Sequence, residues 1–196
     1  MGRLLDILEI CRPNRTADSI VSVDVADLKS RGIEALLLDL DNTLVPWHGY
    51  DVPVEVVSWL RDVEKQGVRM CIVSNTRYPG RLRRLAEQLR VPFVKGRLKP
   101  LRSAFRPALE LLQVPVERAA VVGDQIFTDI LGGNRLGLYT VLVKPMGRRE
   151  FFGTRISRFF ERLILKALAK SSNSLAETAE EREQSAAPGS QSKSRR

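Results

Sequence analysis

The sequence predicts an α/β fold in which a parallel sheet carries helices on both faces. Short apolar runs recur between residues 35 and 143, and segments with a helical spacing of apolar residues separate them. Chains that alternate strands and helices in this way form parallel sheets, because each helix crosses one face of the sheet before the next strand begins. The two cysteines are too few for a disulfide framework, and the sequence contains no internal repeat.

The apolar runs give the expected strands. Residues 35–38 form a continuous apolar run, which is typical of a parallel strand buried on both faces. Further strands are expected at residues 68–73, at Phe93, at 119–122 and at 139–143. Cys71 lies in the second of these runs and is interpreted as a buried thiol.

The segments between these strands give the expected helices. Asp51 and Pro53 suit a helix start, and apolar residues follow them at helical spacing. Gly137 closes the last expected helix. The other helices are expected from about Pro79 and at residues 104–112 and 126–136.

The two ends of the chain differ from this core, which is assigned to residues 33–146. Residues 1–32 are interpreted as an N-terminal extension, and the alternation of apolar and polar residues over 20–25 predicts a short edge strand. Residues 147–170 predict a basic amphipathic helix, because their apolar and basic residues lie on different faces at helical spacing. Residues 171–196 contain almost no large apolar side chain and are expected to be disordered.

Positive charge is concentrated in one part of the chain. Residues 77–106 contain ten lysines and arginines against the single acid Glu87, and this balance of +9 equals the net charge of the whole chain. Such a field favours an anionic partner: a phosphorylated lipid, a membrane surface or a nucleic acid. A signal peptide is not evident, and no stretch approaches the roughly 20 apolar residues that a membrane span requires. We expect a cytoplasmic protein. The sequence does not decide whether this protein also contacts the inner face of the membrane peripherally.

Polar side chains follow the expected strands at one edge of the sheet. In open parallel sheets this carboxyl edge is where ligands bind. The residues that follow the strands in this way are Asp39, Asp41, Ser74, Asn75, Lys99, Asp124 and Asp129. A cluster of carboxylates with a hydroxyl and a lysine suits phosphoryl transfer, in which a carboxylate attacks phosphorus and a second one moves protons. Carboxylate oxygens also suit Mg²⁺, a hard cation that screens the charge of a phosphate.

These motifs resemble those of the haloacid dehalogenase-type phosphatases. The run from Asp39 to Leu44 is similar to the signature of that family, and its other three motifs follow in order at Ser74, Lys99 and Gly123. The resemblance implies a Rossmann-like sheet with strand order 5-4-1-2-3. It implies that Asp39 is the nucleophile and Asp41 the general acid and base. It also implies that the phosphate is bound by Ser74, Asn75 and Lys99. The implied Mg²⁺ ligands are Asp39, the Asp41 backbone carbonyl and Asp124, and Asp129 would support these ligands.

The chain also resembles the YqeG-like branch of subclass IIIA, which is related to mitochondrial phosphatidylglycerophosphate phosphatases. Arg31-Gly32-Ile33 and Thr154-Arg155 belong to this similarity. It implies phosphatidylglycerophosphate as the substrate, although a fold family does not fix a substrate. The spacing of the motifs leaves no room for a cap domain, because helices and strands already fill the 35 positions from 39 to 74 and the 25 from 74 to 99. An open site suits a large substrate.

Other interpretations stay open at this point. The substrate could be a nucleic-acid end or a phosphoprotein, and a nucleic-acid or ribosome-associated binding protein would also explain the basic charge. Ser74 could cap a helix, Asn75 could make a turn, and Asp129 could be a first-turn helix acid. His48 is interpreted as a loop or rim residue, and Trp47 as either a core residue or a membrane-contacting one. The helix at 148–169 could dock on a bilayer or pack on the domain.

Overall fold

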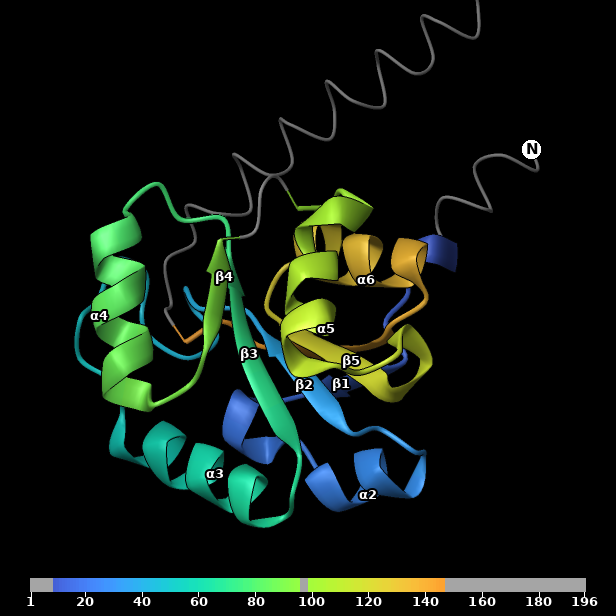
Figure 1. Ribbon diagram of the computed structural model, residues 1–196, viewed down its shortest axis with the longest axis horizontal. Helices are drawn as coiled ribbons and strands as arrows, with labels where there is room; N and C mark the ends of the chain where they lie inside the picture. The colour runs from blue at the N-terminus through green and yellow to red at the C-terminus, as the bar shows by residue number, and fades with distance from the viewer. Residues whose placement is uncertain (1–8, 96–98, 147–196) are drawn as a thin grey trace, which may run out of the picture. The chain divides into compact units, whose positions relative to one another are not determined.

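The computed structural model describes residues 9–95 and 99–146, which form an open, fully parallel sheet with helices on both faces (Figure 1). The sheet has six strands in the order β1-β6-β5-β2-β3-β4. Their bounds are β1 (Arg15–Ala17), β2 (Ala35–Leu38), β3 (Arg69–Ser74), β4 (Phe93–Lys95), β5 (Ala119–Gly123) and β6 (Tyr139–Val143). These residues lie within one compact unit, Met1–Arg148.

The observed strand order differs from the predicted one by an extra strand. The five predicted strands lie in the predicted order, but β1 adds a sixth beside β6, with Arg15 in register with Val141. The sequence Arg-Thr-Ala of β1 carries no apolar run, so periodicity could not reveal it. β1 is held by its neighbour: Asn14 Oδ1 accepts hydrogen bonds from the Thr140 backbone N–H at 2.8 Å and from the Thr140 hydroxyl at 2.9 Å.

The predicted edge strand at residues 20–25 was wrong. This segment is a short 3₁₀ turn, Ile20–Ser22, followed by helix α2, Val25–Ser30. Asp24 caps α2, because its Oδ1 accepts a hydrogen bond from the Asp27 backbone N–H at 3.0 Å. Of the apolar residues that suggested alternation, Ile20, Val23 and Val25 are buried in the core, whereas Val21 is 37% exposed.

The remaining helices lie where the sequence places them, with local differences. Their bounds are α3 (Val54–Lys65), α4 (Pro79–Leu89), α5 (Arg106–Leu112) and α6 (Leu131–Leu136). The helix predicted from residue 104 begins as a 3₁₀ turn, Arg102–Ala104, and continues as α5. The helix predicted over 126–136 begins as a π-helical turn, η4 (Ile126–Ile130), before α6. Such turns are frequent at functional sites.

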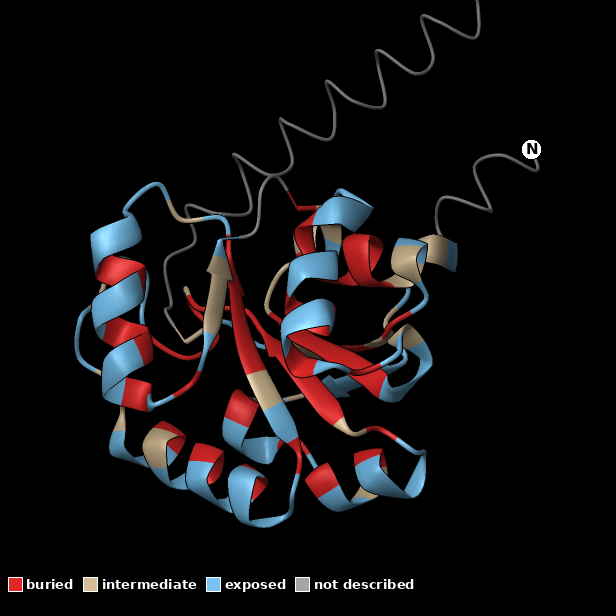
Figure 2. Cartoon of the chain, in the orientation of Figure 1, coloured by how far each residue is buried: buried red, intermediate tan, exposed pale blue. Residues whose placement is uncertain are grey.

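Two apolar cores fill the space on either side of the sheet. Leu36 and Leu38 of β2 face the core covered by α2, α3 and α4, and Leu37 faces the core covered by α5. This alternation follows from the pleat of a strand, which sends successive side chains to opposite faces. Strands β2 and β5 are buried along their whole length, β3 is buried except at its start, and the outer faces of the helices are exposed (Figure 2). The connections between β2 and β3 and between β3 and β4 contain one helix each in the described residues, so no cap domain is inserted there.

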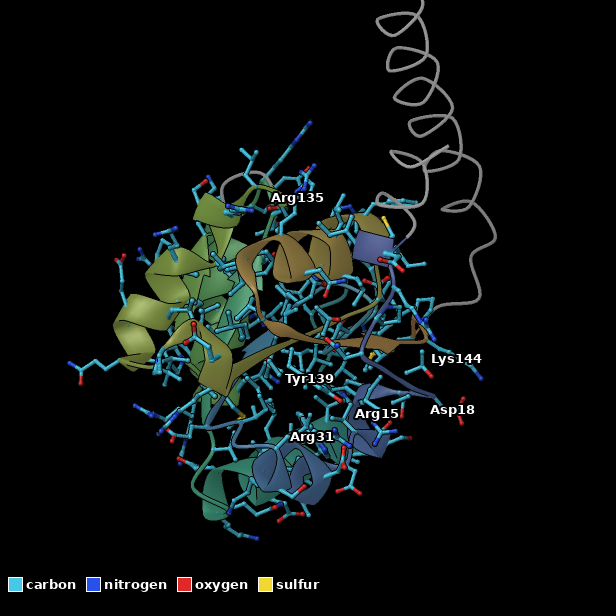
Figure 3. The ribbon with its side chains drawn as sticks, turned by 90° about the vertical axis from the view of Figure 1, so that its right-hand side faces the viewer. Arg15, Asp18, Arg31, Arg135, Tyr139 and Lys144 are labelled. Atoms are coloured by element: carbon cyan, nitrogen blue, oxygen red, sulfur yellow. The ribbon has the colours of Figure 1, made fainter. Side chains whose placement is uncertain are left out.

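Ion pairs and ring contacts link the N-terminal segment to the strand-β6 edge of the sheet. Lys144 forms an ion pair with Asp18, and the guanidinium of Arg31 lies 5.8 Å from the centroid of the Tyr139 ring (Figure 3). Arg15 pairs with Asp27 at 3.5 Å. Within the described residues, no helix is long and apolar enough to span a bilayer. The predicted helix at 147–170 and the predicted disordered tail lie outside the described residues.

Candidate active site

Parallel strands bring the predicted site residues to one edge of the sheet. Asp39 directly follows β2, Ser74 ends β3, and Asp124 directly follows β5. Strand β2 lies between β3 and β5, so the three residues leave neighbouring strands at the same end. The Asp39 backbone N–H donates to the Val122 carbonyl at 2.9 Å, which holds the loop after β2 against β5.

A buried lysine joins two of the acids. Lys99 Nζ lies 2.7 Å from Asp39 Oδ1 and 2.9 Å from Asp129 Oδ1. The side chains of Lys99 and Asp129 are 1% and 0% exposed. An ammonium removed from water this completely requires charged partners, and it holds both carboxylates in fixed positions.

Asp129 is positioned by its own turn and by a glycine. Its Oδ2 accepts hydrogen bonds from the Gln125 backbone N–H and the Thr128 hydroxyl, both at 3.3 Å. A Cβ at Gly123 would lie 2.3 Å from Asp129 Cγ, so only glycine allows the end of β5 to approach this carboxylate so closely. The π-helical turn thus places the Asp129 carboxylate against Lys99 and the end of β5.

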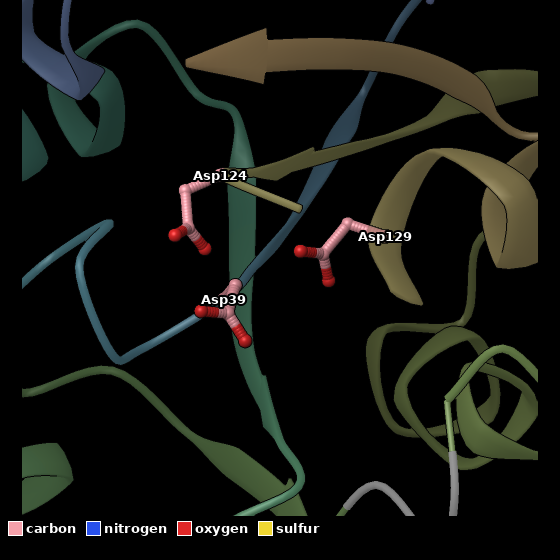
Figure 4. A group of neighbouring side chains, drawn as sticks. All are labelled: Asp39, Asp124 and Asp129. Atoms are coloured by element: carbon pink, nitrogen blue, oxygen red, sulfur yellow. The ribbon is translucent and has the colours of Figure 1, made fainter. Parts of the chain in front are cut away.

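Asp39, Asp124 and Asp129 form a compact group of carboxylates. One oxygen from each lies within 4.8 Å of the others, and Figure 4 shows the three side chains facing a shared space. Asp124 Oδ1 is buried and has no hydrogen-bond partner among the described residues. A buried acceptor without a donor is unfavourable unless a cation or water occupies the space beside it. This all-oxygen group fits a hard divalent cation.

The electrostatics of the cluster favour a cation as well. Burial raises the pKa of Asp39 to about 7, against the opposing effect of the Lys99 ammonium. Burial also raises the pKa of Asp124 to about 8, and the nearby Asp39 and Asp129 carboxylates add to this shift. Burial alone would lower the pKa of Lys99, but Asp129 and Asp39 outweigh it and raise that pKa. Three acids thus share one ammonium, and a bound metal ion would favour the ionised forms of Asp39 and Asp124.

Ser74 and Asn75 lie beside the Lys99 loop. The Asn75 amide accepts from the Lys99 backbone N–H at 3.0 Å and donates to the Lys99 carbonyl at 3.5 Å. Ser74 is 2% exposed, and its hydroxyl accepts from the Thr76 backbone N–H at 3.2 Å. Asn75 therefore makes a long-range tie between the ends of β3 and the Lys99 loop, rather than only the local turn that the sequence left open.

Asp41 is held by an arginine whose role the sequence analysis missed. Arg81 Nη2 lies 2.8 Å from Asp41 Oδ1, and Arg81 Nη1 donates to Asp41 Oδ2 at 3.2 Å. Arg81 Nε and Nη2 also donate to the Gly49 carbonyl at 3.0 and 2.7 Å. The Arg81 side chain is 2% exposed. A signal was present: Arg81 is four residues before Leu85 and eight before Leu89, so it lies on the inner face of α4.

His48 and Trp47 lie at the rim of the site. Both are exposed, and their rings meet edge to face with centroids 4.7 Å apart. The His48 ring also contacts Tyr78 at 5.9 Å, and the His48 backbone N–H donates to Asp41 Oδ1 at 3.3 Å. This confirms the interpretation of His48 as a rim residue. Trp47 is 39% exposed and so is not a core residue.

Sequence comparison identifies the family. Over 158 residues the chain is 35% identical to the Bacillus subtilis protein named "Probable phosphatase YqeG", and this match covers 81% of the chain and 91% of that protein. The chain belongs to the YqeG family of haloacid dehalogenase-type phosphatases. Residues 97–147 also match the HAD-hydrolase-like family model. As a member of the family, the protein is a phosphoric monoester hydrolase.

More distant relatives of this YqeG family member include a plant protein. The "Phosphatidylglycerophosphate phosphatase 1, chloroplastic/mitochondrial" of Arabidopsis thaliana is 27% identical over 169 residues, which cover 79% of the chain but only 47% of the plant protein. Among solved structures, an uncharacterised protein from Corynebacterium glutamicum aligns over 70% of the chain and 93% of its own, with 21% identity and a TM-score of 0.47.

Proposed function

We propose that this protein hydrolyses a phosphate monoester through an aspartyl-phosphate on Asp39, with Mg²⁺ as cofactor and a phosphorylated lipid, phosphatidylglycerophosphate, as substrate. The observation that carries the proposal is the buried contact of Lys99 with Asp39. It fixes one oxygen of the nucleophile, and it supplies positive charge where a phosphate anion would arrive.

The reaction has two displacements. In the first, an Asp39 oxygen attacks phosphorus, the bond from phosphorus to the ester oxygen breaks, and Asp41 gives its proton to the leaving oxygen. In the second, water attacks the acyl phosphate, Asp41 takes the proton of that water, and the bond from phosphorus to Asp39 breaks. Inorganic phosphate leaves, and Asp41 is again protonated for the next turnover.

The contacts of Asp41 shape the first displacement. Both of its oxygens are engaged by Arg81 in the described structure. Proton donation to a leaving oxygen therefore requires Asp41 to release at least one of these contacts as the substrate binds. Its position two residues after Asp39 keeps the carboxyl group within the same loop as the nucleophile.

Metal and phosphate would be held by the remaining residues. Asp39, Asp124 and the Asp41 carbonyl are the proposed Mg²⁺ ligands, with Asp129 supporting them through Lys99. When bound, Mg²⁺ supplies positive charge that offsets the repulsion between the nucleophile and the phosphate. Ser74 and Asn75 are proposed to bind the phosphate oxygens together with Lys99.

Three observations support a lipid phosphate as the substrate. The plant relative carries that activity in its name. The described connections between the motifs contain no cap domain that could enclose a small molecule. Exposed basic residues also lie near the site, among them Arg77 and Arg102. A diphosphorylated headgroup at an anionic surface complements this charge.

Two substrates test the proposal. Wild-type protein with Mg²⁺ should release phosphate from phosphatidylglycerophosphate in mixed micelles, and Asp39→Asn should abolish that release while the protein stays folded. The matched control is Asp62→Asn, since Asp62 is an exposed acid on α3. Equal turnover of a 3′-phosphorylated oligonucleotide would contradict the lipid assignment, and near-normal turnover by Asp39→Asn would remove Asp39 as nucleophile.

A further inference from the structure

Exposed apolar side chains gather on the loops that build the site. Trp47 and Tyr50 lie in the connection after β2, Tyr78 in the one after β3, Leu101 two residues after Lys99, and Ile126 two residues after Asp124. We call these five side chains the apolar rim; they are Trp47, Tyr50, Tyr78, Leu101 and Ile126. Each connection that carries a predicted site residue contributes at least one of them.

The distribution of exposed apolar residues is uneven. In the described part of the chain, eight large apolar side chains are exposed, and five of these belong to the rim. Rim members range from 36% exposed at Ile126 to 59% at Tyr78. Single exposed apolar residues are ordinary, but their concentration around one site marks an interaction surface.

Contacts between side chains hold part of the rim together. The His48 ring lies between those of Trp47 and Tyr78, at centroid distances of 4.7 and 5.9 Å, and so joins two connections. The guanidinium of Arg84 lies 5.3 Å from the centroid of the Tyr50 ring. The rim is thus a partly ordered surface made from separate segments of the chain.

Cations alternate with the apolar side chains. Exposed Arg77 precedes Tyr78, exposed Arg102 follows Leu101, and exposed Arg84 covers Tyr50. Arginine binds phosphate groups through its paired N–H donors, and tyrosine and tryptophan favour the boundary between water and lipid. The combination complements a surface that is anionic outside and apolar beneath.

We propose that the apolar rim docks the active site onto an anionic phospholipid bilayer. This inference deepens the proposed function and rests on it for the identity of the surface. Leu101 and Ile126 favour a bilayer over a single-stranded nucleic acid, because aliphatic side chains gain free energy in lipid but offer no flat face on which a base can stack. Docking at this edge would let the enzyme take a headgroup phosphate without removing the lipid from the membrane.

Tryptophan fluorescence tests the inference directly. The chain has two tryptophans, Trp47 at 39% exposed and Trp59 at 9% exposed on α3. Full-length Asp39→Asn protein would be mixed with vesicles of phosphatidylglycerol and phosphatidylcholine whose acyl chains carry bromine, which quenches a tryptophan in contact with lipid. We expect quenching that is lost in Trp47→Phe. Binding without quenching, or quenching that persists in Trp47→Phe, would overturn the proposal.

Affinity measurements with a matched control complete the test. Tyr78→Ser with Leu101→Ser should weaken sedimentation with these vesicles about tenfold or more. Leu111→Ser is the control, because Leu111 is 53% exposed on α5 but lies outside the rim. Equal loss in both proteins, or release of the protein by an unlabelled oligonucleotide but not by salt, would contradict a lipid surface. Because Asp39→Asn is used, docking can succeed even where lipid hydrolysis fails, which keeps the two proposals distinguishable.

Discussion

At the scale of single residues, the site is built on two buried cations, each paired with different acids. Lys99 forms ion pairs with Asp39 and Asp129, whereas Arg81 forms an ion pair with Asp41 and donates to the Gly49 carbonyl. Both cations are almost fully removed from solvent. Loss of either cation would therefore leave a buried carboxylate without its charged partner and would destabilise the fold. The proposed nucleophile Asp39 and the proposed acid/base Asp41 are therefore held by different cations, although only one residue separates them.

Removal of the Arg81 side chain tests the second pair. Arg81→Met should lower the free energy of unfolding by about 3 kcal/mol, because it removes the charged partner of the Asp41 carboxylate and the donors to the Gly49 carbonyl. Urea denaturation measures this change. Arg83→Met on the exposed face of the same helix is the control and should change stability by less than about 0.5 kcal/mol. Equal effects of the two substitutions would mean that Arg81 is not the partner of Asp41.

Some contacts of the site could be predicted from the sequence, and others could not. The polar residues after each strand predicted the meeting of Asp39, Lys99 and Asp124, because strand order fixes which chain ends are neighbours. The pairing of Asp41 with Arg81 joins positions 40 apart through a helix whose rotation about its axis decides the contact. Helical spacing could have placed Arg81 on the inner face of α4, but it could not have shown which acid lies opposite.

At the scale of elements, the close approach of β5 to the turn η4 builds the floor of the site. Gly123 ends β5, and Asp129 lies in η4. Apolar runs predicted strands 35–38 and 139–143 with the observed bounds, since both are apolar enough to be buried in the sheet. They could not predict β1 or the π-helical turn, because long-range pairing and tight local packing decide those elements.

Substitution of Gly123 tests this floor. A Cβ at this position would meet Asp129 Cγ at 2.3 Å, so Gly123→Ala must displace the carboxylate that holds Lys99. We expect the turnover rate to fall about 100-fold, because small displacements of catalytic groups have effects of this size. Gly80→Ala is the control, since nothing lies within 4 Å of a Cβ there. Wild-type turnover by Gly123→Ala would contradict this view of the site.

At the scale of the whole molecule, the positive charge is smaller at the surface than the sequence suggests. Two of the ten basic residues between 77 and 106, Arg81 and Lys99, are buried and neutralised by acids. The negative charge of the site is buried too, and it links stability to pH and to metal ions. The reduced surface charge and the dependence of stability on pH both arise because folding brings these residues together. Neither could therefore be predicted from the composition of the chain.

The raised pKa values predict how stability changes with pH. Asp39 and Asp124 titrate near 3.8 when unfolded but at about 7 and about 8 in the folded protein. A raised folded pKa means that the folded state retains protons which the unfolded state has lost, so stability falls as pH rises from about 4 to about 8. In a chelator, the melting temperature should fall across this range, and Mg²⁺ should restore it most at the upper end.

A double substitution separates this effect from other titrations. Asp39→Asn with Asp124→Asn removes both carboxyl groups, so the metal-free protein should lose most of its pH dependence between about pH 4 and pH 8. Calorimetry with and without Mg²⁺ measures both proteins. An unchanged pH dependence in the double variant would show that the titration belongs to groups outside the site.

Trapping the phosphorylated enzyme tests the aspartyl-phosphate on Asp39 directly. Wild-type protein would be mixed with a radiolabelled phosphate ester and Mg²⁺, quenched within a single turnover, and reduced with borohydride, which converts an acyl phosphate at aspartate into homoserine. Peptide mapping would then locate the modified position. An aspartyl-phosphate mechanism predicts conversion at Asp39 alone; conversion at another residue, or full phosphate release with no trapped intermediate, would exclude Asp39 as the nucleophile.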